Sequence, residues 1–122
     1  MSPEKQEHLH KTFSLLYRRP VYFECLDGWY EIIWQLSFAL ETLIEHQILY
    51  GYQLNNDDWF HVLQVKEKFG GLRFYMTGTT EGMDKVINNF EALSKHTCEV
   101  CGMRGAIRCN NQWLECRCED HK

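Results

Sequence analysis

Two pairs of potential metal ligands near the C-terminus have the same spacing. Cys98 and Cys101 are separated by two residues, and so are Cys118 and His121. Zinc binds four nitrogen or sulfur ligands tetrahedrally, and a C-x2-C pair supplies two of them from one tight turn. Gly102 follows the second cysteine, at a position that often needs a positive φ. Three thiolates and one imidazole leave no open position for a reactive water, so the pattern predicts a structural zinc site.

The remaining cysteines provide alternatives for the second pair. Cys116 and Cys118 would share one face of an extended strand, so a C-x-C pair is an alternative, and Cys109 could also contribute a sulfur. The simpler interpretation of Cys25, Cys109 and Cys116 is that each is a small buried apolar residue. A zinc-dependent deaminase would also need a glutamate in a His-x-Glu element, which this sequence lacks.

The elements that position this site follow from the spacing of apolar residues. A first helix is expected from Ser2, followed by proline, to residues 18–20. Asp27 is expected to cap a long second helix, and Thr80 to cap a last helix that runs to about Lys95. The apolar stripe of the second helix consists of Trp29, Ile33, Leu36, Leu40 and Leu43.

From residue 61 the apolar period falls to two, which is typical of strands. Two alternating runs on either side of Gly70 and Gly71 predict a β-hairpin, because two-residue primed turns need positive φ angles. The expected cross-strand pairs are Phe69 with Leu72 and Val65 with Met76 on the buried face, and Lys68 with Arg73 and Lys66 with Tyr75 on the other face.

Several segments together resemble a family of small bacterial and bacteriophage proteins with no assigned activity. Residues 66–75 read KEKFGGLRFY, a near-identical match to a segment of that family. Ser94, the TCEVCG sequence at residues 97–102, Trp113 and the C-x-x-H pair at residues 118–121 follow in the same order.

Gly28 and Trp29, which open a helix, look like a further family element, so the resemblance covers roughly residues 28–122. The family tends to have a residue that is not a ligand where this chain has Cys116, which supports Cys118 and His121 as ligands. The resemblance implies an accessory role in bacteria, prophages or other mobile elements, and it implies no particular reaction.

The hairpin also carries candidate partner-binding residues. Glu67 is expected among apolar residues, which is costly unless it is bonded locally or reserved for a ligand or partner. The other face carries Lys66, Lys68, Arg73 and Tyr75, either as a solvated surface or as a site for nucleic acid or an acidic protein. In the preceding turn-rich segment, Trp59 is a candidate interface anchor, if it is not simply packed in the core.

Composition limits the broad class of the protein. The chain has 122 residues, 44% hydrophobic residues and a formal charge of −4, which is typical of one globular domain without a general affinity for phosphate backbones. No apolar run is long enough to span a membrane, and the polar start predicts no signal peptide. We therefore expect a cytoplasmic protein of the α+β class. Residues 1–97 should form a body of helices packed on a small antiparallel sheet. Residues 98–122 should form a zinc ribbon that belongs to the same cooperative unit.

These features favour a non-enzymatic interaction protein with a structural zinc ion. It would be an accessory factor of a phage or mobile element that binds and inhibits a host defence or nucleic-acid-processing protein. The alternative is a nucleic-acid-binding regulator that uses the ribbon and the basic hairpin face, together with Arg104 and Arg108. An enzyme such as a nuclease is less supported, because neither a phosphate-binding glycine loop nor a nucleophile motif occurs. Its acid–base candidates would be Glu67, Asp57, Asp58 and His61.

Overall fold

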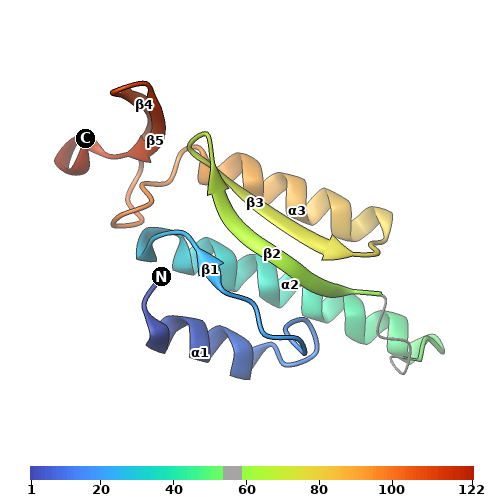
Figure 1. Ribbon diagram of the computed structural model, residues 1–122. Coiled ribbons are helices and arrows are strands. Elements are labelled where there is room, and N and C mark those ends of the chain that lie inside the picture. Colours follow the sequence, from blue (N-terminus) through green and yellow to red (C-terminus); the bar gives the residue numbers. More distant parts are fainter. Residues whose placement is uncertain (54–58) are drawn as a thin grey trace.

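The computed structural model describes residues 1–53 and 59–122 and confirms the α+β class. Figure 1 shows helices packed behind a small sheet, with a separate small element at the C-terminal end. The elements are α1 (Pro3–Thr12), β1 (Phe23–Glu24), η1 (Asp27–Trp29), α2 (Tyr30–Leu49), β2 (His61–Lys68), β3 (Gly71–Thr77), α3 (Glu81–Ser94), β4 (Ala106–Asn110), β5 (Trp113–Arg117) and η2 (Glu119–His121).

The first helix is shorter than its apolar spacing predicts. Ser2 caps α1 by accepting a hydrogen bond from the Lys5 N–H, as expected, but the helix ends at Thr12. The N–H groups of Leu15 and Leu16 donate to the Glu41 carboxylate instead, each at 2.9 Å. This side chain from α2 therefore replaces the carbonyl acceptors that a continuing helix would offer.

The prediction that Asp27 caps the second helix is wrong. One Asp27 oxygen accepts a hydrogen bond from the Ser2 N–H at 2.8 Å, and the other lies 3.1 Å from the Lys5 ammonium. Asp27 thus fixes the start of α1, while η1 leads into α2 without a side-chain cap. The predicted apolar stripe is buried from Trp29 to Leu40, and Ile44 then faces the core more fully than Leu43.

The hairpin is present, but its turn lies one residue earlier than predicted. Phe69 and Gly70 form the turn, with φ of 54° and 83°, so Lys66 lies opposite Arg73 and Val65 opposite Phe74. Both registers place Val65, Leu72 and Phe74 on the buried face. The difference is that Phe69 is 66% exposed instead of buried.

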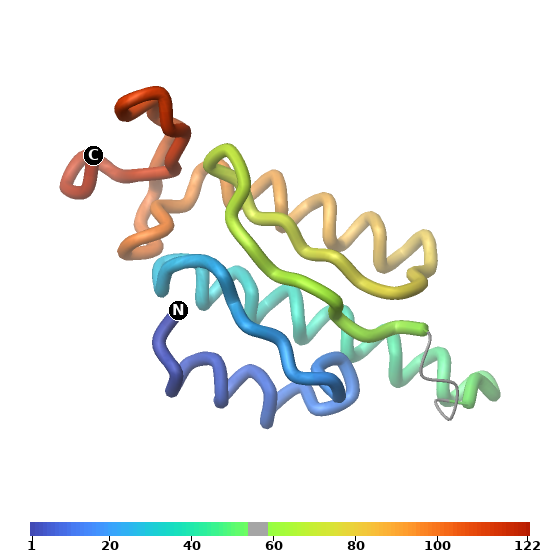
Figure 2. Tube along the Cα trace, in the orientation of Figure 1, coloured from blue at the N-terminus to red at the C-terminus, as the bar shows by residue number. Residues whose placement is uncertain are grey.

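The sheet has a third strand that the sequence pattern does not indicate. β1 lies parallel to β2, with Phe23 opposite Val65, in the order β1-β2-β3. Two residues are too few to show an alternating pattern, so this pairing depends on contacts that are distant in sequence. In Figures 1 and 2, α2 and α3 lie on one face of β2 and β3, and α1 lies beside β1.

Side chains of α3 also cover the outer edge of β3. The Leu72 N–H donates to the Ser94 hydroxyl at 2.9 Å, and the Phe74 N–H donates to the Glu91 carboxylate at 2.8 Å. Thr80 caps α3, as predicted. These bonds satisfy edge groups that would otherwise be open to a further strand.

The C-terminal ribbon, residues 98–122, forms a second small sheet. β4 and β5 are antiparallel and are joined by Asn111 and Gln112, both with positive φ. Within the part of the chain that the structure describes, no helix is both long and apolar enough to cross a membrane.

Candidate metal centre

The structure brings the four predicted ligands together. The ligand atoms of Cys98, Cys101, Cys118 and His121 all lie within 4.8 Å of one another. The Cys101 and Cys118 sulfurs are 3.6 Å apart, and the His121 Nδ1 lies 3.2 Å from the Cys118 sulfur and 3.8 Å from that of Cys98. A tetrahedral ion with metal–sulfur bonds of about 2.3 Å would separate two sulfurs by about 3.8 Å. The cluster therefore fits a four-coordinate metal with three thiolates and one imidazole.

Backbone groups around Cys98 also favour a thiolate. Burial raises the pKa of this thiol, but hydrogen bonds from the backbone N–H groups of Cys101, Cys118 and Val100 outweigh it and bring the pKa down to about 6. Gly102 has a φ of 82° and donates its N–H to the Cys98 carbonyl, which closes the turn. Metal-binding cysteines must be deprotonated, so this turn matches the chemistry of the donor set.

The other cysteines do not join this cluster. Cys116 is fully buried and packs in the hydrophobic core, as its interpretation as a small apolar residue requires. Cys25 is also buried, and burial raises the pKa of its thiol to about 12. Cys109 is exposed, so the expectation that it is buried is wrong.

The first ligand turn is fastened to the start of α2. The Gly28 N–H donates to the Glu99 carbonyl at 2.7 Å, and the Trp29 indole N–H donates to the Thr97 carbonyl at 2.9 Å. A Cβ atom on Gly28 would lie 2.3 Å from the Cys98 carbonyl oxygen, so only glycine allows this approach. Gly28 and Trp29 thus contact the TCEVCG segment directly.

Glu99 completes this connection and was missed by the sequence analysis. Its side chain is buried, and one carboxylate oxygen accepts the Leu26 N–H at 3.0 Å. The other oxygen lies 3.3 Å from the Arg117 guanidinium. Burial raises the pKa of Glu99, against the lowering effect of these two partners. The sequence shows only a glutamate between two ligands. Its partners, Leu26 and Arg117, are distant along the chain, so its role could not be predicted.

A groove of about 450 Å³ separates the tip of the β2–β3 hairpin from the ribbon. We define it by its lining residues: Lys66, Glu67, Lys68, Phe69, Gln112, Trp113 and Leu114. Next to Phe69 in the hairpin turn, Gly70 approaches the Ile107 side chain so closely that a Cβ on Gly70 would lie 3.2 Å from it. Both Phe69 and Trp113 are more than 60% exposed. The sequence analysis missed Phe69 on this surface, because the predicted turn, one residue later, placed its side chain on the buried face.

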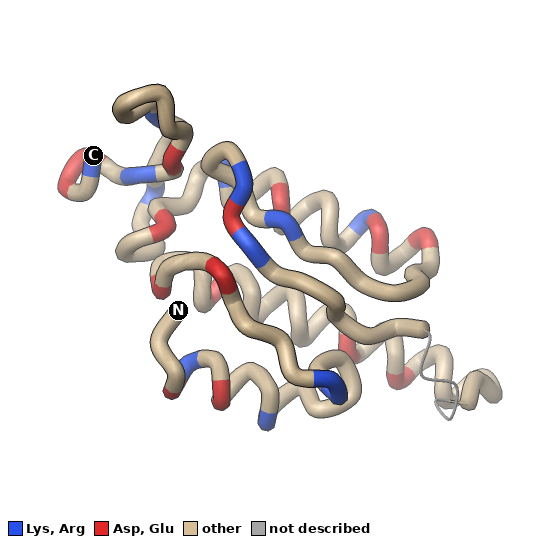
Figure 3. Tube along the Cα trace, viewed as in Figure 1, with Lys and Arg blue, Asp and Glu red and all other residues tan. Residues whose placement is uncertain are grey.

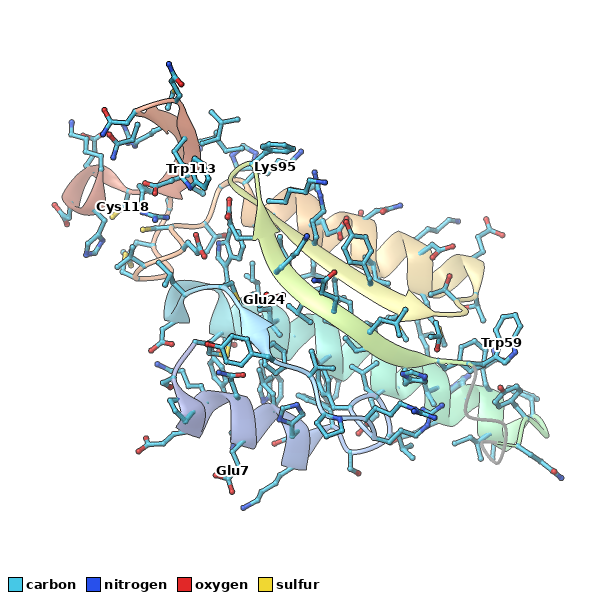
Figure 4. The ribbon with its side chains drawn as sticks, in the orientation of Figure 1. Glu7, Glu24, Trp59, Lys95, Trp113 and Cys118 are labelled. Atoms are coloured by element: carbon cyan, nitrogen blue, oxygen red, sulfur yellow. The ribbon has the colours of Figure 1, made fainter. Side chains whose placement is uncertain are left out.

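The proposed partner-binding residues are divided among three places. Lys66, Glu67 and Lys68 line the groove, whereas Arg73 and Tyr75 lie on β3, with Arg73 directly opposite Lys66. Trp59 lies at the opposite end of the molecule from Trp113 (Figure 4).

The Glu67 carboxylate accepts a hydrogen bond from the Gly70 N–H at 2.7 Å. Its position among apolar residues therefore has a local structural explanation. Of the other acid–base candidates, His61 is buried in β2, and Asp57 and Asp58 lie outside the described residues. Among the described residues, the structure does not bring His61 and Glu67 into contact.

Comparison with protein-family models, curated proteins and solved structures gives no significant match.

Proposed function

We propose that this chain is a non-enzymatic interaction protein in which a structural zinc ion holds the ribbon in place. The observation that carries the proposal is the groove, because one of its walls belongs to the hairpin and the other to the ribbon. A metal at the Cys98, Cys101, Cys118 and His121 cluster would fix the second wall relative to the first. Exposed aromatic residues in such a concave site are typical anchors of protein interfaces.

The donor set supports a structural role for the ion. Zinc with three thiolates and one imidazole has four protein ligands, so the bound metal would stabilise the fold and leave no position for substrate. Cytoplasmic localisation belongs to the same proposal, since reduced cysteines are the ones that bind metal.

The biological role that we propose is that of a phage or mobile-element accessory factor. It would bind and inhibit a host defence or nucleic-acid-processing protein. The resemblance in residues 66–75 and in the cysteine-containing segment supports this context, and the formal charge of −4 is compatible with a partner that has a basic channel.

A nucleic-acid-binding regulator is the second candidate, and one observation favours it. Lys66 and Arg73 lie directly opposite each other, and the exposed ring of Phe69 is nearby in sequence. Like charges in opposing positions destabilise a strand pair unless an anion lies between them. Phosphate groups and stacked bases would satisfy this arrangement.

Affinity purification of the tagged protein from bacterial lysate, with and without nuclease treatment, distinguishes the two candidates. We expect a stoichiometric protein partner that survives nuclease treatment and is lost when the metal is chelated. A Lys85→Glu variant, which alters an exposed lysine on α3 far from the groove, is the matched control. Recovery of nucleic acid alone would instead support the regulator. Elemental analysis of the purified protein should give one zinc ion per chain.

A further inference from the structure

We propose that the groove binds an extended acidic peptide segment that inserts one large apolar side chain between the hairpin tip and the ribbon. This inference rests on the proposed function and specifies the chemistry of the partner segment that enters the groove, which is distinct from any basic channel of that partner.

The shape and lining of the groove favour a side-chain anchor. Its volume of about 450 Å³ is within the range of clefts that bind small ligands, which is large enough for one side chain. Phe69 contributes an exposed ring from the hairpin turn, and Trp113 and Leu114 contribute apolar surface from the ribbon. An aromatic or long aliphatic side chain placed here would remove apolar area from water on both walls.

The charges around the groove favour an acidic partner. Lys66 and Lys68 line it, Arg73 lies opposite Lys66, and Lys95 reaches the turn, where its Cε would be 3.4 Å from a Cβ on Gly71. None of these four cations makes an ion pair with the described residues. Figure 3 shows the basic positions on both strands of the hairpin.

Other cations of the chain do have acidic partners. Lys5, Lys11, Lys85, Arg108, Arg117 and Lys122 each lie within 4 Å of a carboxylate oxygen. The hairpin tip therefore carries four cations that make no ion pair with the described residues, beside the carboxylate of Glu67, on a protein whose formal charge is −4. Carboxylates of a partner would supply the missing negative charge.

The backbone of β2 favours an extended chain as the occupant. Pairing between β1 and β2 ends at Glu24 and Lys66, and no other described strand pairs with β2 on that side. Residues 67–69, at the end of β2 and in its turn, therefore border the groove without a strand beside them. A peptide in extended conformation can place backbone groups along such an edge while alternate side chains enter the groove.

A peptide fits these observations better than a nucleic acid. The cations near the groove are few, and Glu67 contributes a carboxylate to its lining. Affinity for a phosphate backbone depends on the number of phosphates that are neutralised, and the negative formal charge opposes approach of a polyanion. A short acidic segment with an apolar anchor needs only a few cations and uses the apolar walls.

The test uses the zinc-loaded 122-residue chain and three fluorescein-labelled probes. These are the heptapeptide Asp-Asp-Glu-Trp-Glu-Asp-Asp, its neutral analogue with Asn and Gln in place of the acids, and a heptameric oligothymidylate. We expect saturable binding of the acidic peptide, at least tenfold weaker binding of the neutral analogue, and weaker binding of the oligonucleotide. Equal binding of both peptides, tighter binding of the oligonucleotide, or no saturable binding of the acidic peptide would overturn the proposal.

Matched variants locate the binding site. K66E/K68E and Trp113→Ala should each weaken binding of the acidic peptide at least tenfold, whereas Lys85→Glu and Trp59→Ala should leave it within twofold. In the unaltered protein, peptide addition should shift the Trp113 indole N–H resonance and leave that of Trp59 in place. This NMR measurement needs no substitution, so a variant that fails to fold does not decide the outcome. A shift at Trp59 but not at Trp113 would overturn the assignment of the groove.

The same variants separate this inference from the proposed function. If K66E/K68E still captures the nuclease-resistant protein partner from lysate, the groove is not the binding site, and the interaction function stands. If the unaltered protein captures no protein partner, the proposed function itself fails.

Discussion

Between residues 1 and 97, the helices and strands pack their apolar side chains into one common core, whereas residues 98–122 bury only Cys98, Glu99, Cys116 and Cys118. In the ribbon, two of those four side chains are proposed metal ligands, and most of the rest of the element is exposed. The body can therefore be stabilised by apolar burial, but the ribbon cannot. A bound metal ion and the hydrogen bonds to η1 must supply the stabilisation that apolar burial does not provide in the ribbon.

Removal of the metal should have the largest effect, and it should affect the ribbon first. Structural zinc sites contribute about 10–16 kcal/mol of apparent binding energy, which becomes folding energy when the site exists only in the folded state. After chelation, we expect backbone amides of β4 and β5 to exchange rapidly with solvent while those of α2 remain protected, in contrast to the single cooperative unit expected from the sequence. Hydrogen exchange measured by mass spectrometry tests this, and equal loss of protection in both regions would remove the distinction between them.

A cavity in the body should destabilise the whole chain. Leu36 is fully buried in α2, so Leu36→Ala should lower the free energy of unfolding by about 2–5 kcal/mol. Leu49→Ala, at a position that is 78% exposed on the same helix, should change it by less than about 0.5 kcal/mol. Urea unfolding of the zinc-loaded protein measures both values. A Leu36→Ala effect no larger than that of the control would show that the body does not depend on its core.

A methyl group at the junction should disturb both regions together. Gly28→Ala would place a Cβ 2.3–2.4 Å from the Cys98 and Glu99 carbonyl oxygens, so it should cost about 1–3 kcal/mol and weaken metal binding. Gly82→Ala is the matched control, because its Cβ would meet nothing closer than 3.9 Å. Competition with a chromogenic zinc chelator measures the affinity. Unchanged metal affinity in Gly28→Ala would mean that the ribbon is positioned independently of α2.

The smallest effect should come from the ion pair that fixes the start of α1. The N–H of Ser2 and the ammonium of Lys5 lower the pKa of Asp27, so its charged form stabilises the folded state above the unfolded pKa, near 4. This contribution is lost as the pH falls through the lower, folded-state pKa. Asp27→Asn should therefore cost less than about 1 kcal/mol at pH 7, because the Asp27 and Lys5 side chains are about 40% exposed.

The pH dependence distinguishes the charge of Asp27 from its hydrogen bond. Asparagine can still accept the Ser2 N–H, so the difference between Asp27→Asn and the unaltered protein should shrink as the pH falls below about 4 and disappear below the lower, folded-state pKa. Urea unfolding at pH 7, 5 and 3 measures this difference. A difference at pH 3 as large as that at pH 7 would assign the effect to geometry rather than to charge.

The metal site could be predicted from the sequence more fully than the surface beside it. Ligand pairs such as Cys98 with Cys101 lie within one turn of chain, so their spacing alone indicates a shared site. The groove depends instead on residues from two distant segments, and the exposure of Phe69 depends on which two residues form the hairpin turn. Period-two alternation could not decide that turn, because both registers bury Leu72 and Phe74.

Local patterns thus determined α2, α3, the hairpin and the pair Cys98 and Cys101, and favoured Cys118 and His121 as the second pair, because periodicity and short spacings act within a few residues. Only the tertiary structure decided that Asp27 binds Ser2, that β1 joins β2, and that Glu99 links Leu26 to Arg117. Each of these contacts joins groups far apart along the chain. Their partners are selected by packing of the complete fold, a property that no short segment carries.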